Sequence, residues 1–499
     1  MVNRFAACLN ALGAGKGDRV AILLPNVIPC VISYYATLKI GAIAVMCNPQ
    51  HTDRELLFQF QDSGATVLIT MDLLAKRMIA LKSQTNLKQI IHTSFGDYLP
   101  LAASLLFRLF GGRKGLTTRV QPADNVYRWK NVLSTYSANH RRTGISTDDV
   151  AMIQYTGGTT GVAKGVMLTH ANLSFQTQQI DAWFPQFAGQ DEIILGALPF
   201  FHSFGLTCSM NNAIFAGWTN VLLPSPRPEK LLTAIRKYSP TFVPLVPTMY
   251  IALLNHPNIR KTSMTCIKGC FSGSAPLPLE VIRKFEGLTG AAISEGFGLT
   301  EAAPITHANP FNGVRKVGSV GLPFPDTECR IVDLENGTRD VPVGETGELL
   351  IRGPQVMKGY WNNPQETARA LKDGWLFTGD IARMDEDGYF YIVDRKKDMV
   401  ISGGHNVYPR EIDEVLYSHP KIKEACAIGL PHPSRGEQIK AFVVAVEGES
   451  VTSEELIAYC QARLADYKLP TGFEFRKNLP KSDVGKILRK VLREEELAK

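Results

Sequence analysis

The chain has 499 residues, 45% of them hydrophobic and 20% charged, and 54 lysines and arginines against 47 acidic residues give a formal net charge of +7. A chain of this length is too long for one hydrophobic core, so we expect two or more domains, and the composition excludes a disordered protein. The basic residues form no run typical of a nucleic-acid-binding arm, which excludes nucleic acid as a partner. Their surplus suits phosphate-rich ligands or an anionic membrane surface.

The cysteines and the N-terminal residues predict a cytoplasmic protein. The nine cysteines are scattered and include no Cys-x-x-Cys pair, as is typical of reduced thiols. No apolar secretory segment follows Met1, and Lys39 and Gly41 interrupt the apolar stretch from Val31 to Cys47. This stretch is too short to cross a membrane and predicts a buried helix followed by a strand.

The first 70 residues alternate between helical and strand patterns. A helix over 5–13, closed by Gly13, precedes apolar strands at 19–24, 40–48 and 65–70. Strands that alternate with helices in this way predict a parallel α/β sheet.

A further helical pattern runs from Leu101 to Lys114, with apolar residues on a helical period and basic residues toward its end. Two interpretations stay open for it. The helix could lie on a membrane surface, or it could pack against its own domain.

A buried strand at 150–155 leads into a loop that combines glycines, threonines and a lysine: Thr156-Gly157-Gly158-Thr159-Thr160-Gly161-Val162-Ala163-Lys164-Gly165. Glycines free the backbone to curl, hydroxyls donate hydrogen bonds, and the lysine adds a positive charge, so the loop can cradle an anion. The spacing differs from that of a Walker phosphate loop, which disfavours an ordinary P-loop NTPase. On these residues alone, a flexible surface turn stays open.

The next strand pattern, at 193–198, ends in an aromatic segment that contains His202. A single histidine among aromatic residues is either a packed core residue or a catalytic one, and both stay open. No second histidine or carboxylate follows at ligand spacing, which disfavours a zinc site.

Two glycine-containing segments follow apolar strand patterns, Ser272–Pro276 and Glu295–Glu301. The second offers an aromatic ring for a base (Phe297), a hydroxyl for a phosphate (Thr300) and a carboxylate for Mg²⁺ (Glu301). A plain glycine-rich turn is the alternative.

From Val317 to Gly353 the pattern changes to short alternating strands, which predicts a small β-barrel. Asp380 follows and could accept hydrogen bonds from both hydroxyls of a ribose. After Asp394 the composition predicts a compact α+β unit, in which Thr452 and Glu455 form a capping box. Near its end Lys486 follows a glycine turn, and alone it would be read as a solvated surface charge.

These segments resemble, in order and spacing, the motifs of the adenylate-forming superfamily. The segments are 155–165, 295–301, 375–380, 394–398 and 480–489. Within the superfamily the chain is most similar to the bacterial long-chain fatty acyl-CoA synthetases, over essentially its whole length. The most specific likeness is Asp373-Gly-Trp-Leu-Phe-Thr-Gly-Asp380, joined to Ile392-Val-Asp-Arg-Lys-Lys-Asp398.

The resemblance implies an α/β fold with a large N-terminal domain (1–393) of two α/β lobes plus a small β-barrel, and a mobile α+β C-terminal lid domain (394–499). Relatives carry an extra segment before the helix at 5–13, so the N-terminal segment is short by this comparison. The implied reaction activates a fatty acid with Mg-ATP to an acyl-adenylate and pyrophosphate. CoA then displaces AMP to give the thioester.

Carried over residue by residue, the resemblance assigns a role to each motif. The loop from Thr156 to Lys164 would grip the β- and γ-phosphates, Thr300 the α-phosphate, and Glu301 the Mg²⁺. Gly273, Ser274, Ala275 and Pro276, together with Glu295, Gly296, Phe297 and Gly298, would frame the adenine, and Asp380 and Arg395 would hold the ribose. Lys486 would bridge the acyl carboxylate and the α-phosphate, Lys397 would be the hinge, Gly403 and Gly404 would lie beside the CoA tunnel, and His202 would shape the mouth of the acyl pocket.

Two other classes of function stay open. One is an acyl-adenylating ligase for aryl or medium-chain acids, or for transfer to a carrier protein; amino acids are disfavoured because no aspartate lies between Pro199 and Met210. The other is an inactive lipid-binding homologue with the same fold. The sequence also leaves open a homodimer and a peripheral contact with the inner face of the membrane.

Overall fold

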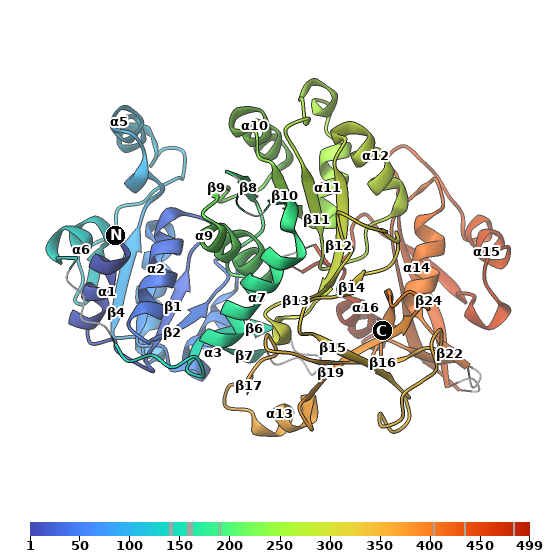
Figure 1. Ribbon diagram of the computed structural model, residues 1–499. Helices are drawn as coiled ribbons and strands as arrows, with labels where there is room; N and C mark the ends of the chain where they lie inside the picture. The colour runs from blue at the N-terminus through green and yellow to red at the C-terminus, as the bar shows by residue number, and fades with distance from the viewer. Residues whose placement is uncertain are drawn as a thin grey trace.

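The computed structural model describes residues 1–138, 143–156, 163–187, 189, 191–402, 405–433, 436–482 and 485–499. The chain forms two α/β lobes, a smaller β-unit and a C-terminal α+β domain (Figure 1). The predicted fold class is therefore confirmed.

The first lobe is built on an eight-stranded sheet with the order β17-β7-β6-β2-β1-β3-β4-β5. From β6 to β5 its neighbours run parallel, whereas β7 and β17 close one edge antiparallel. Its strands are β1 (Arg19–Leu23), β2 (Ile43–Met46), β3 (Val67–Met71), β4 (Gln89–Thr93), β5 (Val126–Arg128), β6 (Val150–Thr156), β7 (Lys164–Thr169) and β17 (Gly359–Tyr360). Its helices are α1 (Val2–Ala11), α2 (Ile28–Lys39), α3 (Asp53–Ser63), α4 (Asp72–Leu81), α5 (Leu101–Phe110) and α6 (Trp129–Thr135).

The second lobe contains a seven-stranded sheet with the order β14-β13-β12-β11-β10-β8-β9. Its strands are β8 (Ile193–Gly196), β9 (Thr219–Leu222), β10 (Phe242–Leu245), β11 (Gly269–Ser272), β12 (Ala292–Gly298), β13 (Ile305–Ala308) and β14 (Leu322–Pro323). Its helices are α7 (His170–Trp183), α8 (Ser203–Gly205), α9 (Asn212–Ala216), α10 (Pro228–Tyr238), α11 (Pro247–Leu254) and α12 (Leu279–Thr289), with a π-helical segment at Leu206–Asn211. The central strands of both lobes, such as β2, β3, β10 and β11, are continuously buried, because helices cover both faces of a parallel sheet.

The β-unit is a five-stranded antiparallel sheet. Two of its strands lie within 317–353, where the sequence predicts a small barrel, and three follow that segment. Its strands are β15 (Glu328–Val332), β16 (Gly347–Arg352), β18 (Leu371–Lys372), β19 (Trp375–Met384) and β20 (Phe390–Arg395), and helix α13 (Pro364–Ala370) lies between β17 and β18 in sequence. Because β20 ends at Arg395, the predicted domain boundary at Asp394 falls inside a strand, and the boundary stays a prediction.

The C-terminal domain is a second five-stranded sheet with helices against it. Its elements are β21 (Val400–Ser402), β22 (His405–Val407), α14 (Pro409–Tyr417), β23 (Ile422–His432), β24 (Gly436–Ala445), α15 (Ser453–Gln461), β25 (Gly472–Phe475) and α16 (Arg489–Leu497). The Thr452 side chain caps α15 by accepting a hydrogen bond from the Glu455 amide at 3.2 Å. The reciprocal half of the predicted capping box is absent, since the Glu455 carboxylate instead pairs with Lys421 at 3.0 Å.

The predicted elements of the first lobe are present with shifted ends. The helix predicted over 5–13 begins at Val2, and the strand predicted over 40–48 is confined to Ile43–Met46 because Ile40 and Gly41 end α2 and turn the chain. All nine cysteines are free. Within the described ranges, no helix is both long enough and apolar enough to cross a membrane.

Candidate functional site

A cleft of about 1640 Å³ collects residues from both lobes, the β-unit and the C-terminal domain. Every predicted motif that has described residues contributes at least one of them to the lining of the cleft. Examples are Thr156, Phe297, Thr300, Arg395 and Lys486. The fold therefore brings together segments that are far apart in the sequence.

The glycine- and threonine-rich motif at 155–165 begins at the end of β6 and ends at the start of β7. Thr156 and Lys164 face each other across these antiparallel strands, and both line the cleft. The predicted ligands Gly157, Gly158, Thr159, Thr160 and Gly161 lie outside the described residues. The pairing of β6 with β7 thus places the two described ends of the motif at the cleft.

Lys164 already has an anionic partner in the structure. Its ammonium group forms an ion pair with Glu366 of α13 and lies 4.9 Å from the centre of the Tyr360 ring. Glu366 also pairs with Arg369 at 2.5 Å, and the ion pair with Lys164 lowers the pKa of the Glu366 carboxyl. The ionised Glu366 carboxylate is therefore paired with the Lys164 ammonium group, the cation that a bound polyphosphate would need.

We expect the substitution Glu366→Gln to lower the KM for ATP by about three-fold, because removing a competing, partly exposed anion is worth only a fraction of 1 kcal/mol. Steady-state kinetics at varied ATP measure the change. The control is Glu335→Gln, an exposed carboxylate that lines the same cleft and has no ion pair within the described part of the chain. An unchanged or higher KM in Glu366→Gln would contradict this role.

Thr300 and Glu301 lie in a short 3₁₀ turn that follows β12. The Thr300 hydroxyl is 3.1 Å from the Ser203 hydroxyl, and the Tyr360 hydroxyl donates to the Glu301 carboxylate at 2.8 Å. Gly298 allows this turn, because a Cβ atom there would lie 1.9 Å from the Pro304 carbonyl oxygen. The turn therefore holds a hydroxyl and a carboxylate at fixed positions on the cleft wall.

Glu301 fits a magnesium ion that is held jointly by the protein and by the phosphates of a bound substrate. Among the residues that the structure describes, no group of three histidine, cysteine or acidic side chains could hold a metal ion without help. Mg²⁺ usually takes one or two protein carboxylates and fills its remaining positions with water and substrate phosphates. Glu301 lines the cleft and has one oxygen engaged by Tyr360, so it meets this requirement.

The predicted adenine-binding residues divide into two groups. Lining the cleft are Gly273, Ser274, Gly296, Phe297 and Gly298. Ala275, Pro276 and Glu295 are not among the lining residues. The Glu295 carboxylate instead accepts from the amides of Leu277 at 3.4 Å and Gly318 at 3.5 Å, and burial raises its pKa to about 7. Its side chain thus supports two loops behind the cleft.

Asp380 is not among the residues that line the cleft, but it provides a buried acceptor next to the lining residues Gly379 and Arg395. The residue is 3% exposed, and one of its carboxylate oxygens is 3.1 Å from the Arg395 guanidinium. The other oxygen is buried and has no hydrogen-bond partner among the residues that the structure describes. Burial raises the pKa of Asp380. Buried acceptors are rarely left unpaired, so this oxygen is a candidate to accept a hydrogen bond from a ligand.

Lys486 reaches the cleft from the C-terminal domain. Its loop turns at Gly485, where φ is +77° and where a Cβ atom would lie 2.5 Å from the Thr248 hydroxyl of α11. The loop therefore packs closely on the second lobe. Desolvation and the neighbouring Arg395 together lower the pKa of Lys486 to about 8, against the opposing effect of Asp380. Although Lys486 is exposed to solvent, its ammonium group interacts electrostatically with Asp380 and Arg395.

This pKa gives a pH dependence with a defined sign. A lysine whose pKa falls from 10.5 to about 8 is protonated below that pH and neutral above it. If the reaction uses the ammonium form, kcat/KM for ATP-dependent pyrophosphate release should fall by about ten-fold per pH unit above the pKa of the free enzyme. A Lys486→Arg variant, which stays protonated, should show no such fall. A fall of the same size in both proteins would contradict the assignment to Lys486.

His202 and Lys397 also line the cleft. His202 caps α8, since its Nδ1 accepts a hydrogen bond from the Phe204 amide at 3.2 Å. This contact agrees with a packed residue that shapes the wall. Burial lowers the pKa of Lys397. Gly403 and Gly404 lie outside the described residues.

The structure adds three residues that the sequence did not single out: Ser203, Tyr360 and Glu366. Tyr360 lies in β17, which pairs antiparallel with β7 beside the motif at 155–165. Glu366 lies in α13, which follows β17 in sequence. No local signal marks them, because this strand pairing joins distant parts of the chain. Ser203 follows His202 directly, and only the packing of α8 against the turn at Thr300 reveals its contact.

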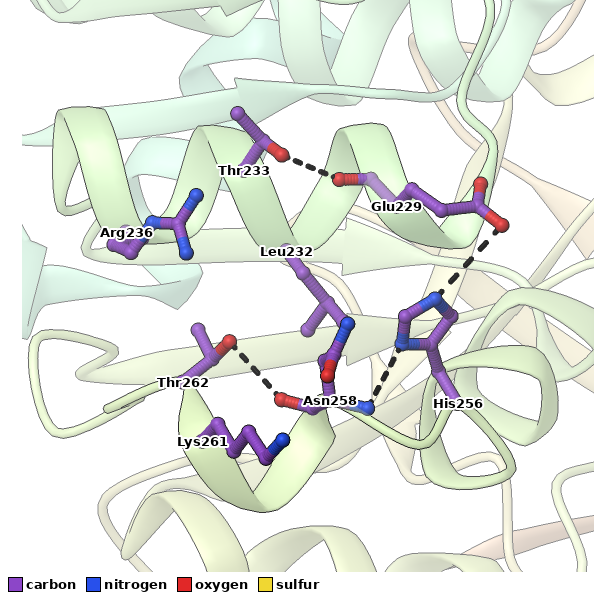
Figure 2. Close-up of a pocket in the computed structure, with 8 residues that line it drawn as sticks. All are labelled: Glu229, Leu232, Thr233, Arg236, His256, Asn258, Lys261 and Thr262. Atoms are coloured by element: carbon purple, nitrogen blue, oxygen red, sulfur yellow. Dashed lines mark hydrogen bonds and ion pairs between the residues drawn. The ribbon is translucent and has the colours of Figure 1, made fainter.

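A second pocket, of about 280 Å³, lies on the second lobe between α10 and residues 256–262 (Figure 2). In it His256 is 3.8 Å from the Glu229 carboxylate and accepts from the Asn258 amide at 3.2 Å. None of the motif residues that the structure describes lines this pocket. The polar groups that the motifs supply are therefore gathered in the larger cleft.

Comparisons with known proteins agree with this geometry. Residues 1–361 match the family model described as AMP-binding enzyme, and residues 411–486 match the AMP-binding enzyme C-terminal domain. The chain is 47% identical to a long-chain-fatty-acid–CoA ligase of Bacillus subtilis, over 99% of this chain and 88% of that protein. It is 40% identical to the protein of the same name from an Escherichia coli strain, over 98% and 88% of the two chains. The solved structure of ATP-bound MatB from Rhodopseudomonas palustris is similar with a TM-score of 0.86 and 30% identity, covering 99% of this chain and 92% of that one.

Proposed function

Because the chain belongs to the AMP-binding enzyme family, we propose that it joins a long-chain fatty acid to CoA in two steps, and that the residues of the large cleft perform both. The protein is a fatty acid–CoA ligase: ATP activates the acid as an acyl-adenylate, and CoA then takes the acyl group. The observation that carries the assignment of residues is the convergence of Lys486, Glu301 and Lys164 on one cleft. Asp380 lies behind this lining, paired with the lining residue Arg395.

The first step must bring two anions together. The oxygen of the fatty acid carboxylate attacks the α-phosphorus of ATP, and the bond from that phosphorus to the bridging oxygen of pyrophosphate breaks. The Lys486 ammonium would lie between the acyl carboxylate and the α-phosphate, where their negative charges converge. Thr300 would donate its hydroxyl hydrogen bond to the α-phosphate. A cation and a donor held in place before the reaction stabilise this charge without reorganisation.

The polyphosphate would lie toward Lys164, whose ammonium would exchange Glu366 for the β- and γ-phosphates. Mg²⁺ is a proposal of the same kind: Glu301 would hold it, with Tyr360 orienting the carboxylate. Bound there, the ion neutralises part of the charge of the triphosphate.

The nucleoside would be held by the walls on either side. Phe297 and the backbone at Gly273 and Ser274 would contact the adenine. The unpaired oxygen of Asp380 would accept from a ribose hydroxyl, and Arg395 would fix the orientation of that carboxylate. These contacts are the same before and during the reaction, so they contribute binding energy more than rate.

The second step needs a different lid position. The CoA thiolate attacks the acyl carbonyl carbon, and the bond to AMP breaks. The C-terminal domain would rotate about Lys397, withdraw Lys486 and bring Gly403 and Gly404 beside the CoA tunnel. Domain motions of this kind commonly separate two half-reactions that share one site.

The test is pyrophosphate release that depends on a fatty acid, followed by thioester formation that depends on CoA. A panel of acids from short to long chains, assayed by AMP formation with CoA, should show the highest kcat/KM for long chains. Preference for an aryl acid, or transfer to a holo-carrier protein without CoA, would establish the alternative ligase. Absence of acid-dependent pyrophosphate release would establish an inactive homologue.

The place of the reaction in the cell is part of the proposal. A long-chain acid partitions into lipid, so the enzyme would work in the cytoplasm and contact the inner face of the membrane peripherally. A homodimer is proposed as its assembly, which sedimentation of the purified protein would test.

A further inference from the structure

Helix α5 projects from the first lobe and presents its apolar residues to solvent (Figure 1, upper left). The exposed fractions of its large side chains are 87% for Leu101, 59% for both Leu105 and Leu106, 69% for Leu109 and 47% for Phe110. Isolated exposed leucines are common, but five such residues on one ten-residue helix form a contiguous apolar surface.

The polarity of α5 is the reverse of that of an ordinary surface helix. At 100° per residue, Leu101, Leu105, Leu109, Ala102, Leu106 and Phe110 cover one half of the helix, and all of them are exposed. The face toward the protein consists of Ala103, Ser104 and Phe107, all partly buried. A helix that only packed on its own domain would bury its leucines. Packing on the domain therefore does not explain this sequence.

One residue anchors the helix against the lobe. The Phe107 ring lies over Gly96 so closely that a Cβ atom on Gly96 would be 2.6 Å from it. This contact fixes α5 to the 3₁₀ turn Phe95–Tyr98 with its leucine face turned away from the lobe.

Basic side chains follow the apolar face directly. Arg113 and Lys114 are exposed and have no ion pair within the described ranges, and Arg119 is exposed a few residues later. Unpaired cations beside an inserted apolar surface are complementary to anionic phospholipid headgroups, and each contributes about 1 kcal/mol near such a membrane, as a general expectation. Between two copies of this chain the same cations would repel one another.

We propose that α5 is a membrane-docking element, which inserts its leucine face into the interfacial layer of a bilayer that contains anionic phospholipid, while Arg113 and Lys114 contact the headgroups. A helix of ten residues is about 15 Å long and lies in the surface instead of crossing it. This inference rests on the proposed function, because docking would place the enzyme on the phase into which its fatty acid substrate partitions.

The experiment is co-sedimentation of the full chain with vesicles of phosphatidylcholine alone or of phosphatidylcholine with phosphatidylglycerol. We expect binding to the mixed vesicles that the double variant Leu105→Asp/Leu109→Asp weakens by at least about ten-fold, since each substitution removes a buried leucine from the lipid. The control is Val314→Asp/Val343→Asp, which places the same two charges at residues that are 67% and 55% exposed and lie outside α5. The variant Arg113→Glu/Lys114→Glu should abolish the preference for anionic vesicles.

Both α5 variants should keep the thermal midpoint of unfolding and the ligation rate with a fatty acid that is monomeric in water. Loss of ligation in every protein, with α5-dependent vesicle binding retained, would reject the proposed function and leave docking in place. Equal vesicle binding by wild type and Leu105→Asp/Leu109→Asp would overturn the docking proposal. So would a dimer in solution that this variant converts to monomer while wild type fails to bind vesicles, because the leucine face would then contact a second copy.

Discussion

Lys486→Ala is expected to slow acyl-adenylate formation by about a thousand-fold, while thioester formation from supplied acyl-adenylate and CoA stays within about two-fold of wild type. The ammonium group is the cation that the C-terminal domain brings near Asp380 and Arg395. Without it, the acyl carboxylate and the α-phosphate would approach with their repulsion less compensated. The second half-reaction would use a lid position in which Lys486 is withdrawn, so it should not depend on this residue.

Single-turnover pyrophosphate release measures the first half-reaction, and AMP release from added acyl-adenylate and CoA measures the second. The matched control is Lys490→Ala, which removes a lysine of the same domain that lines the cleft and pairs with Glu494 at 3.5 Å. The control should retain both half-reactions. Equal loss of the two half-reactions in Lys486→Ala would refute the alternating-lid assignment.

Asp380→Ala is expected to weaken ATP binding by about a hundred-fold with a much smaller effect on turnover at saturating ATP, since hydrogen bonds to a charged group contribute about 1.5–3 kcal/mol each. The carboxylate is buried, and its unpaired oxygen is the acceptor proposed for the ribose. The substitution also leaves the Arg395 guanidinium without its partner.

Equilibrium binding of ATP and the KM for ATP measure the effect. Asp380→Asn keeps the shape and one acceptor while removing the charge, so it should fall between wild type and Asp380→Ala. Asp387→Asn, at an exposed turn between β19 and β20, is the control for a lost carboxylate in the same β-unit. A defect confined to turnover, with unchanged ATP binding, would show that Asp380 does not hold the ribose.

The structure agrees with the proposition that a lysine of the C-terminal domain shares a pocket with the nucleotide-binding motifs. It also shows that this pocket is already internally paired: Glu366 neutralises Lys164, and Tyr360 holds Glu301. In the proposed binding mode, ATP and its Mg²⁺ would therefore exchange existing partners of Lys164 and Glu301. Glu366 is expected to be a partner that ATP displaces, so Glu366→Gln should change the KM for ATP only modestly. Lys486 is expected to act on the reacting groups, so Lys486→Ala should slow acyl-adenylate formation strongly.

The sequence alone determined the α/β fold class and the order of the motifs. These follow from local signals: apolar strands that precede each glycine-rich loop, and the Thr452 cap of α15. The class of reaction was implied by the resemblance of the motifs to those of the adenylate-forming superfamily. The family and the ligase function are confirmed by comparison with relatives. The role of each site residue stays a prediction, which the substitutions above test.

Only the tertiary structure decided which side chains meet. The pairing of β17 with β7 brings Tyr360 to Glu301 and α13 to Lys164, and the packing of the Gly485 turn on Thr248 brings Lys486 to the cleft. The direction of the α5 leucine face belongs here too, because helical periodicity gives the same pattern for an inward and an outward face and only the Phe107 contact distinguishes them. Contacts between distant segments depend on the packing of whole elements, which no short stretch of sequence encodes.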